Sequence, residues 1–534
     1  MIFFDKFFKS AYEAVELGND YLFGLNGKDV NLELAYKYFE ISAAKGFKPA
    51  ADALNFYFTV ENGELIMNPE FEEVYPMIKG LRQDAQNGVA EACYILGVQK
   101  LSPETDDFIF NQGLNWIKTA ADKGYPPAMY ALAKVLFSGN RVPKDEIRGK
   151  ALVLESAKKG HIPAVAALFN IGEQEIATNI LSKMAEENNP EALEMLAEVE
   201  NDKKNFQKAA NLFERAAELG NVGAMFNLAL YYEHGDRIPK DIHKALKWYK
   251  AAAEKGDATS MVNLGSLLED GPEDIQNHKE AFQWFLKAAE SGYTVAWNEV
   301  AHCYKYGIGV ERSADKAYEN YLKATDTEDP SMTYFNLYLL YADGKACEQN
   351  LEKAVPWLIR AAEMKSSVAN YHLGLLYKNG VGVEQDGMEA FRRFKISAEG
   401  GHPHALYELG IIYKYVFNDP HSAFECFYRS ASENIESMYE LGTCYYYGKG
   451  CEKDDNKAFQ CYRKAAEAGN CEAQYEVGVC YRQGEGCEQN FLKAIEWYEK
   501  AIAKGNTKAM VNCGILYDNG LGVETDPKKA SYYY

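Results

Sequence analysis

The sequence predicts an all-α fold: an α/α superhelical solenoid of about fifteen helix-pair repeats, the last of them incomplete. Three observations predict it, namely an alanine that recurs about every 36 residues, a helix-capping residue four positions before that alanine, and a glycine in the loops. The length of 534 residues exceeds what one hydrophobic core usually holds, so the chain is either several domains or a repeat array. The repeat decides for the array, in which each unit buries its apolar face against its neighbours.

The recurring alanine sets the register of the repeat. The segment KALKWYKAAAEKGDATSMVNLG at 244–265 returns in related form at 280–301 and 493–514. Successive register alanines are 33 to 37 residues apart. They are Ala209, Ala245, Ala281, Ala317, Ala354, Ala390, Ala423, Ala458, Ala494 and Ala530. Loop glycines extend the register towards the N-terminus, through Gly220, Gly160, Gly124, Gly88 and Gly46.

Each unit is predicted to hold two helices. The first helix has apolar residues at helical spacing and ends at a glycine that favours a left-handed cap. These glycines are Gly307, Gly344, Gly380, Gly448, Gly484 and Gly520. The second helix begins at a residue whose side-chain oxygen accepts a hydrogen bond from the free amides of the first turn. The predicted caps are Asn31, Asp145, Asn205, Asp241, Asn277, Ser313, Asn350, Asp386, Asp419, Asp454, Asn490 and Asp526.

The spacing also predicts three parts. Residues 1–160 form an N-terminal arm of about four units with irregular spacers, and residues 221–534 form a regular arm. Between them, residues 161–220 hold two shortened units that turn near Asn188. Because a constant rotation between units produces a uniform superhelix, this irregular stretch is predicted to bend it.

Composition limits the classes of partner. The net charge of −21 disfavours nucleic acid, since a phosphate backbone would be repelled. No apolar stretch is long enough to predict a membrane span, and no secretory signal precedes the first unit, so a cytoplasmic protein with free thiols is expected. Both ends are apolar. The aromatic run at 3–8 is expected to cap the array, and Tyr532, Tyr533 and Tyr534 are expected to be exposed, which allows self-association or indicates a fragment.

The repeat has the pattern A-x-x-x-L-G-x-x-Y-x-x-G-x-G-V-x-x-D-x-x-K-A-x-x-W/Y-Y/F-x-K-A-A-x-x-G, best matched at 369–401 and 509–526. It resembles the Sel1-like repeat family, a relative of the tetratricopeptide repeats with a longer loop between the helices. The resemblance implies an adaptor or scaffold that binds other proteins. It leaves open a regulatory subunit of a membrane-associated enzyme or degradation complex. A hydrolase, once proposed for cysteine-rich relatives, is disfavoured because no nucleophile, base and orienting group are found together.

The resemblance also suggests binding residues. In the tetratricopeptide geometry the first helix lines the concave surface, and the residue two before the conserved leucine points into it. In four consecutive units this residue is Tyr371, Tyr407, Tyr439 and Tyr475. Its polar companions about two turns further on are Lys378, Lys414, Tyr446 and Arg482. Tyrosine offers contact area and a hydroxyl at low entropic cost, so these residues are predicted to bind partners, unless the rings only pack between helices.

The cysteines show a second pattern. Cys444 and Cys480 share one register, and Cys451 and Cys487 stand where other loops have valine. No histidine or further cysteine completes a zinc pattern, so these residues are predicted to be small buried hydrophobes. No cofactor, metal or catalytic residue is predicted.

Overall fold

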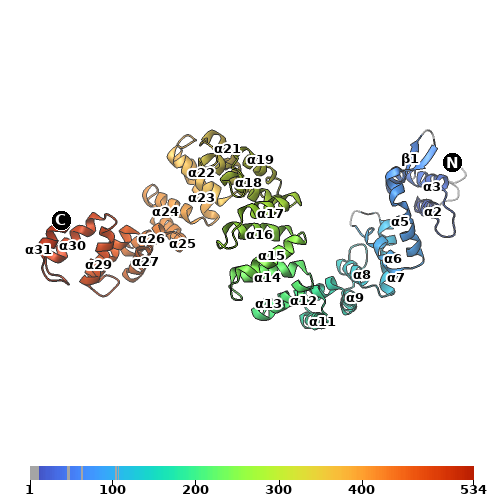
Figure 1. The fold of residues 1–534 in the computed structure, drawn as a ribbon, viewed down its shortest axis with the longest axis horizontal. Coiled ribbons are helices and arrows are strands. Elements are labelled where there is room, and N and C mark those ends of the chain that lie inside the picture. The colour runs from blue at the N-terminus through green and yellow to red at the C-terminus, as the bar shows by residue number, and fades with distance from the viewer. Residues whose placement is uncertain (1–10, 45–47, 62–63, 103–104, 106) are drawn as a thin grey trace. The chain divides into compact units, whose positions relative to one another are not determined.

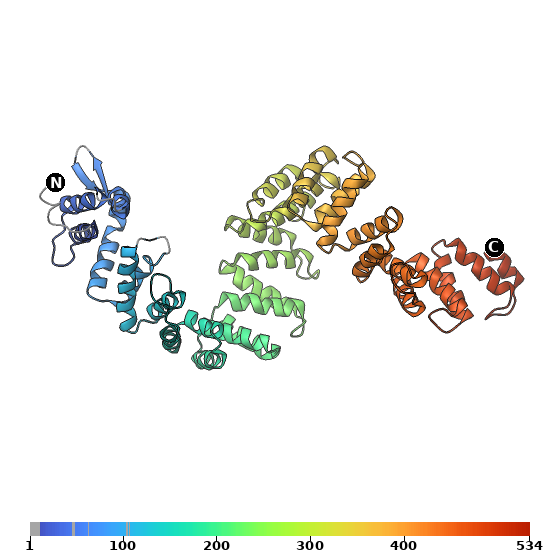
Figure 2. The same ribbon diagram turned by 180° about the vertical axis from the view of Figure 1, so that it is seen from behind.

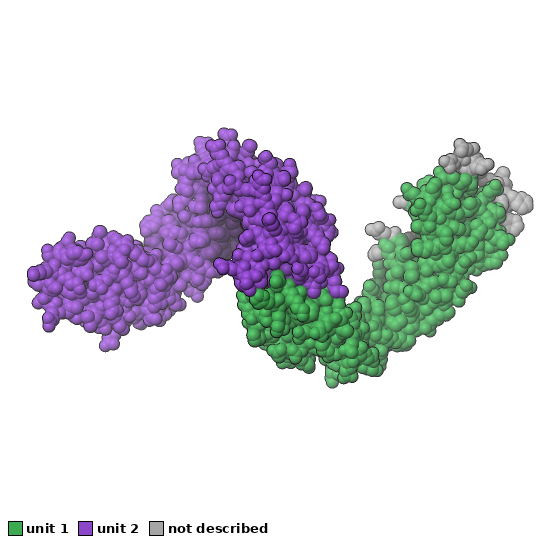
Figure 3. All heavy atoms as spheres, viewed as in Figure 1, with its two compact units in different colours: residues 1–248 green, residues 249–534 purple. Residues whose placement is uncertain are grey.

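The computed structural model describes residues 11–44, 48–61, 64–102, 105 and 107–534. The apolar run at 3–8, predicted to cap the array, lies outside the described residues. Within the described residues the chain is helical apart from one hairpin, which confirms the all-α fold class. The chain packs as two compact units, Met1–Trp248 and Tyr249–Tyr534 (Figure 3).

The part of the first unit that the structure describes runs from α2 to α14, and the division between the two units falls within α15 (Ile242–Glu254) (Figure 1). Its elements are α2 (Ala11–Phe23), α3 (Leu32–Ala44), α4 (Lys48–Tyr57), β1 (Phe58–Glu61), β2 (Glu64–Met67), α5 (Pro69–Gln86), α6 (Ala90–Val98), α7 (Asp107–Asp122), α8 (Pro126–Ser138), α9 (Glu146–Lys158), α10 (Ile162–Asn170), α11 (Gln174–Glu186), α12 (Pro190–Asp202), α13 (Phe206–Glu218) and α14 (Val222–His234).

The second unit continues with helices that pack chiefly on the helix before and the helix after them, as both views of the ribbon show (Figure 2). Its elements are α16 (Ala258–Asp270), α17 (His278–Glu290), η1 (Thr294–Ala296), α18 (Trp297–Tyr306), α19 (Ala314–Lys323), α20 (Ser331–Ala342), α21 (Leu351–Glu363), α22 (Ser367–Asn379), α23 (Gly387–Glu399), α24 (Pro403–Tyr415), α25 (Pro420–Ser430), α26 (Ile435–Tyr447), α27 (Asp455–Glu467), α28 (Cys471–Gln483), α29 (Phe491–Ile502), α30 (Thr507–Asp518) and α31 (Pro527–Tyr533).

The register alanines lie at the centre of the packing. All ten are buried, with at most 2% of their surface exposed. Their small side chains let the second helix of a pair approach its neighbours closely, while leucine and aromatic residues fill the remaining space. The shortened units predicted at 161–220 correspond to α10–α11 and α12–α13, whose loops at 171–173 and 203–205 are brief. The bend proposed for this stretch stays a prediction.

The capping prediction is confirmed at eleven of its twelve positions, where the side chain accepts a hydrogen bond from an amide of the first turn. It is wrong at Asn205, which begins α13 but makes no such bond. The amide of Asn205 instead donates to Glu200 at 2.9 Å, and Glu200 is only 4% exposed. This contact holds the side chain of Asn205 toward Glu200, in an orientation from which its Oδ1 does not accept a hydrogen bond from the first turn.

Left-handed glycines end the first helices as predicted, with one shift in position. Gly307, Gly380, Gly448 and Gly484 follow the last helical residue directly, with φ between 66° and 77°. Gly344 and Gly520 also have positive φ, but each comes one residue later, after Asp343 and Asn519.

The glycine that follows the conserved leucine does not cap a helix; it is required because there is no room for a side chain at this place. A methyl group on Gly374 would lie 2.7 Å from the ring of Phe394, and one on Gly478 would lie 2.5 Å from the ring of Tyr498. The same relationship holds for Gly410 with Phe427 and for Gly442 with Tyr462. In these four pairs the first helix therefore needs a glycine where the large aromatic ring of the second helix of its own pair lies against it.

The hairpin β1–β2 was not expected. It pairs antiparallel, with Phe58 opposite Met67, inside the stretch that the sequence shows as an irregular spacer. Phe58 is buried and its ring lies 5.4 Å from that of Tyr36, so the strand contributes to the core of the first helices. Aromatic and β-branched residues favour a pleated strand at this place.

The C-terminal tyrosines differ in part from the expectation of exposure. Tyr532 and Tyr534 are 82% and 63% exposed, but Tyr533 is buried. The ring of Tyr533 stacks on Tyr517 at 5.8 Å, and its hydroxyl donates to Glu499 at 3.1 Å. None of the helices in the described part of the chain combines the length and the apolar character that crossing a bilayer requires.

Candidate protein-interaction surface

The four tyrosines predicted to bind partners occupy the same position in α22, α24, α26 and α28. Each is partly exposed, and each ring packs against the buried aromatic residue of the second helix of its own pair. The ring centroids are 6.1 Å apart for Tyr371–Phe394, 6.3 Å for Tyr407–Phe427, 5.8 Å for Tyr439–Tyr462 and 5.9 Å for Tyr475–Tyr498. The tyrosine row therefore packs with one part of each ring and leaves the rest accessible.

The environment keeps three phenols of this row neutral. Burial, reinforced by nearby glutamates, raises the pKa of Tyr371, Tyr407 and Tyr439. A protonated phenol can both donate and accept a hydrogen bond. The hydroxyl of Tyr475 already accepts one from Nδ2 of Asn512 at 3.3 Å. The row thus presents aromatic surface with polar tips, which suits contact with a peptide.

The charged companions of the row form bridges between successive helix pairs. Nζ of Lys378 lies 2.7 Å from Oε2 of Glu408, and Nζ of Lys414 lies 2.6 Å from Oε2 of Glu440. In each case the lysine ends one first helix and the glutamate follows the tyrosine of the next. These ammonium groups hold the array together, so a partner's carboxylate would have to compete for them.

The other two companions make different contacts. The hydroxyl of Tyr446 donates to Oε2 of Glu485 at 2.7 Å. Burial raises the pKa of Tyr498, and the positive charge of Arg482 opposes that shift, which places the guanidinium beside the packed ring. Neither residue reproduces the lysine bridge of the two preceding units.

The residues at the positions of the lysine–glutamate bridge vary along the second unit. The pKa of the glutamate is raised where no lysine faces it. Glu476 corresponds to Glu408 and Glu440, but Tyr446 stands where they have a lysine. Burial, and then Glu472, raise the pKa of Glu476 to about 7. At the corresponding positions of α16 and α18 both residues are acidic, and burial, followed by Asp270 and Glu299, raises the pKa of Glu269 to about 7. Carboxyl groups without a lysine are thus partly protonated near neutral pH.

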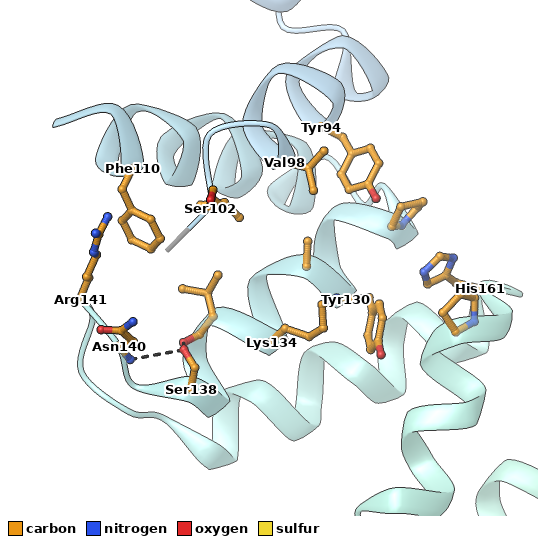
Figure 4. A pocket seen from close by; sticks show the side chains of 15 residues that line it. Tyr94, Val98, Ser102, Phe110, Tyr130, Lys134, Ser138, Asn140, Arg141 and His161 are labelled. Carbon is orange, nitrogen blue, oxygen red and sulfur yellow. Dashed lines mark hydrogen bonds between the residues drawn. The ribbon is translucent and has the colours of Figure 1, made fainter. Parts of the chain in front are cut away.

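The first unit has a pocket on the corresponding helices. It has a volume of about 690 Å³ and lies between α6, α8 and the start of α10. Tyr94 and Tyr130, which stand in the register of the tyrosine row, line it together with His161, whose ring lies 5.5 Å from that of Tyr130. Figure 4 shows these three residues toward one end and Phe110 with Arg141 toward the other. The tyrosine register thus contributes to a concave site in this unit.

The pocket is basic among the residues described. Its ionisable side chains other than tyrosines are Lys134, Arg141 and His161. Burial lowers the pKa of His161, so its ring is neutral at pH 7. Nζ of Lys134 lies 5.3 Å from the centre of the Tyr130 ring, and the guanidinium of Arg141 lies 5.2 Å from that of Phe110. The guanidinium of Arg141 also has an ion-pair partner, because its Nε lies 3.4 Å from Oδ1 of Asp107.

The cysteines are placed among apolar side chains. Cys444 and Cys480 are buried, and burial raises the pKa of each thiol to about 12. Cys451 and Cys487 are partly exposed and pack at the edge of the cores around Phe427 and Tyr462. In the part of the chain that the structure describes, no three histidine, cysteine or acidic side chains come together as a metal site would require.

Comparison with models of known protein families shows to which family the chain belongs. The Sel1 repeat model matches it thirteen times, over residues 14–47, 83–125, 126–161, 190–221, 222–257, 258–293, 296–326, 335–366, 367–402, 403–434, 435–470, 471–506 and 507–534. The chain belongs to the Sel1 repeat family. The two longest stretches between these Sel1 repeats, 48–82 and 162–189, also hold helices, which accounts for the larger number of units predicted from the sequence.

Solved structures of Sel1 repeat proteins resemble this chain. A protective antigen of uropathogenic Escherichia coli strains, described as displaying an SLR fold, is 27% identical with a TM-score of 0.45, over 85% of this chain and 93% of that chain. A Sel1 repeat protein from Oxalobacter formigenes is 27% identical with a TM-score of 0.37, over 41% of this chain and 95% of that chain. Yeast Tom70 is 12% identical with a TM-score of 0.37, over 82% and 98% of the two chains. No curated protein matches the sequence.

Proposed function

We propose that this Sel1 repeat protein is a scaffold that holds peptide segments of partner proteins along the surface of its first helices. Proteins built from such repeats generally mediate protein–protein interactions. The observation that carries the proposal is the tyrosine row, in which four successive first helices present a partly exposed ring in one register. In this proposal the chain acts by binding and not by catalysis.

The geometry favours an extended or helical peptide as the bound form. Repeats place equivalent side chains at regular intervals, so a partner meets a similar tyrosine at each step along the array. The neutral phenols offer hydrogen bonds to a peptide backbone, while the rings offer apolar contact. The basic pocket at Tyr94 and Tyr130 supports the same role for the first unit, where it would accept an acidic segment.

The test uses peptides selected by display on the full chain. Their affinity is measured for the wild type and for the double variant Tyr407→Leu/Tyr439→Leu, in which leucine keeps apolar packing against Phe427 and Tyr462. A control is Tyr428→Leu, since this tyrosine is 59% exposed and lies outside the row. The expected result is at least a tenfold loss of affinity in the row variant and no change in the control.

Circular dichroism and the thermal midpoint establish that both variants are folded. Equal affinity of the folded row variant and the wild type would contradict the proposal. A photo-crosslinking amino acid in place of Tyr407 gives a second measurement, because a bound peptide should crosslink there and not at position 428.

A further inference from the structure

The loop between α24 and α25 is shorter than the corresponding loops of the second unit. Residues 380–385 lie between the end of α22 and the cap of α23, and residues 448–453 and 484–489 lie in the next two loops of this kind. Between α24 and the cap Asp419 there are only residues 416–418. The shortfall is also the reason that Ala390 and Ala423 are 33 residues apart. The glycine-x-glycine-valine sequence is missing from this loop.

Full-length loops have a definite packing role. Their second glycine lies on the first turn of the second helix of the preceding pair. A methyl group on Gly450 would lie 2.0 Å from the carbonyl oxygen of Pro420, and one on Gly486 would lie 2.0 Å from that of Asp455. Only glycine permits such a close approach of two backbones, and its positive φ is equally suited to glycine.

The apolar residue after that glycine completes the cover. Val383 packs into the core that contains Val355, and Val523 packs into the core that contains Ile495. Val355 and Ile495 both directly follow the register alanine of their helix. These loops therefore place a glycine on the first turn of the preceding second helix and, one turn further on, an apolar side chain, which is valine after Gly309, Gly382 and Gly522 and cysteine after Gly450 and Gly486.

The first turn of α23 has no such cover. No atom of the described residues outside the immediate helix backbone lies within 4 Å of the place where a side chain of Gly387 would begin. A groove of about 770 Å³ occupies this space, between Gly387, Met388 and Phe391 on α23 and Ile412 and Tyr415 on α24. We call it the α23–α24 groove. It is the space that the missing loop residues would otherwise fill.

Exposed apolar side chains form part of the rim of this groove, which the ion pair of Lys378 and Glu408 also lines. Met388, Tyr415 and Val416 are 58%, 68% and 71% exposed. Phe417 covers part of the floor, because its ring lies 5.1 Å from that of Phe391, yet Phe417 itself is 47% exposed. Contiguous exposed apolar side chains of this kind mark sites of interaction with other molecules.

We propose that the α23–α24 groove binds a turn from a partner protein that carries a glycine followed by an aliphatic residue. Five loops of the second unit show which chemistry covers a first turn of this kind, those with Gly309, Gly382, Gly450, Gly486 and Gly522. The partner's glycine lies on the carbonyl group of Gly387, as Gly450 lies on that of Pro420, and its aliphatic side chain contacts Phe391. This inference does not depend on the tyrosine row, because it follows from the missing loop residues alone.

The probe is a fluorescent peptide with the sequence of residues 379–386, Asn-Gly-Val-Gly-Val-Glu-Gln-Asp, titrated with the full chain and followed by anisotropy. Saturable binding is expected. A peptide with alanine in place of its second glycine should bind at least tenfold more weakly, because its methyl group would meet the carbonyl oxygen of the first turn.

Variants of the protein locate the site. Met388→Glu should weaken peptide binding at least tenfold, and glutamate is tolerated because Glu352 occupies the equivalent position of α21. Leu492→Glu is the matched control, since Leu492 has the same register on α29, is 56% exposed and lies at a joint that a full-length loop covers. The control should bind the peptide as the wild type does.

A loop graft supplies the strongest test. Replacing residues 416–418 by the sequence of residues 380–385 should fill the groove from within the chain, raise the thermal midpoint and abolish peptide binding. The inference is overturned if the wild type shows no saturable binding, or if the graft or the Met388→Glu variant binds as well as the wild type. Dimerisation of the wild type that the graft abolishes would also overturn it, by assigning the groove to a second copy. Tyr407→Leu/Tyr439→Leu should leave this binding unchanged, so the outcome is separate from that of the proposed scaffold function.

Discussion

Nζ of Lys414 lies 2.6 Å from Oε2 of Glu440, and the two side chains are only 19% and 11% exposed. Burial lowers the pKa of Lys414, but the hydrogen bond that its ammonium donates to Glu440, together with the charge of Glu440 and the contact with Tyr415, outweighs this effect and raises the pKa, so the ammonium stays charged. The pair joins α24 to α26 and thus one helix pair to the next. A charged bridge therefore supplements apolar packing at this joint.

Replacing Lys414 by methionine should leave Glu440 as a mostly buried carboxylate without its cation. Loss of one partner of a buried pair costs about 3 kcal/mol, so the region around α26 should open much more easily. Lys378→Met should cost about 1 kcal/mol or less, because Lys378 is 47% exposed and its pair with Glu408 is screened by water. Hydrogen exchange of α24 and α26 measures local opening, which suits a repeat array that need not unfold in one step.

The double variant Lys414→Met/Glu440→Gln is the control for this prediction. It removes the carboxylate together with the ammonium and should recover most of the lost stability. If Lys414→Met and Lys378→Met had equal effects, burial would not be the property that sets the strength of these bridges.

The raised pKa of Glu476 should make the stability of the C-terminal helices depend on pH. Burial raises its pKa from 4.5 to about 7, so the folded state binds a proton more tightly than the unfolded state does. The destabilisation that comes from ionising this buried carboxyl is therefore absent below pH 4.5. It grows as the pH rises and is complete above pH 7. Glu476→Gln should stabilise the chain at pH 8 by about 1 to 2 kcal/mol, a value reduced for partial exposure, and have little effect at pH 5.

Denaturation at pH 5 and pH 8 checks this prediction. Glu408→Gln is the matched variant, since Glu408 has the same register and is paired with Lys378. It should not stabilise the chain at pH 8. A stabilisation by Glu476→Gln that is the same at both pH values would show that the pKa of Glu476 is not raised.

Two glycine-to-alanine substitutions should have opposite effects on the stability of the chain. In Gly478→Ala the new methyl group would lie 2.5 Å from the fully buried ring of Tyr498, and such overpacking costs about 1 to 3 kcal/mol. In Gly387→Ala the methyl group meets open space, and alanine in a helix is favoured over glycine by up to about 1 kcal/mol. Thermal midpoints of the two variants compare them directly. A loss of stability in Gly387→Ala would mean that the first turn of α23 is covered in solution.

Local signals explain why so much of the fold could be predicted from the sequence. Caps such as Asp386 act within one turn of their own helix, and the register alanines recur at a nearly constant step, so both can be inferred from spacing alone. Asn205 is not a cap because its side chain is oriented toward Glu200 on the preceding helix, a contact that spacing alone does not reveal. The hairpin at 58–67 could have been found, since Asn62-Gly63 between two apolar runs is a strong hairpin signal in a sequence.

The site was harder to predict because it depends on contacts between units. The position of the tyrosine row followed from the register, but its packing on Phe394 and its equivalents requires the second helix in place. Lys414 and Glu440 are 26 residues apart in sequence, and their pairing becomes visible only when successive units are stacked. For the α23–α24 groove the sequence offers one signal, the step of 33 residues between Ala390 and Ala423. This short step indicates a shortened loop, but it does not reveal the groove that lies beside that loop.

The thiols of Cys444 and Cys480 should react slowly in the folded chain. With each pKa raised to about 12, only a fraction of about 10⁻⁴ is thiolate at pH 8, and the thiolate is the form that alkylating reagents attack. Their modification by iodoacetamide should be at least about 100-fold slower in the native chain than in the denaturant-unfolded chain. Mass spectrometry of proteolytic peptides measures each cysteine separately. Native rates close to the unfolded rates would show that α26 and α28 open often, and the tyrosine row could not then be a rigid surface.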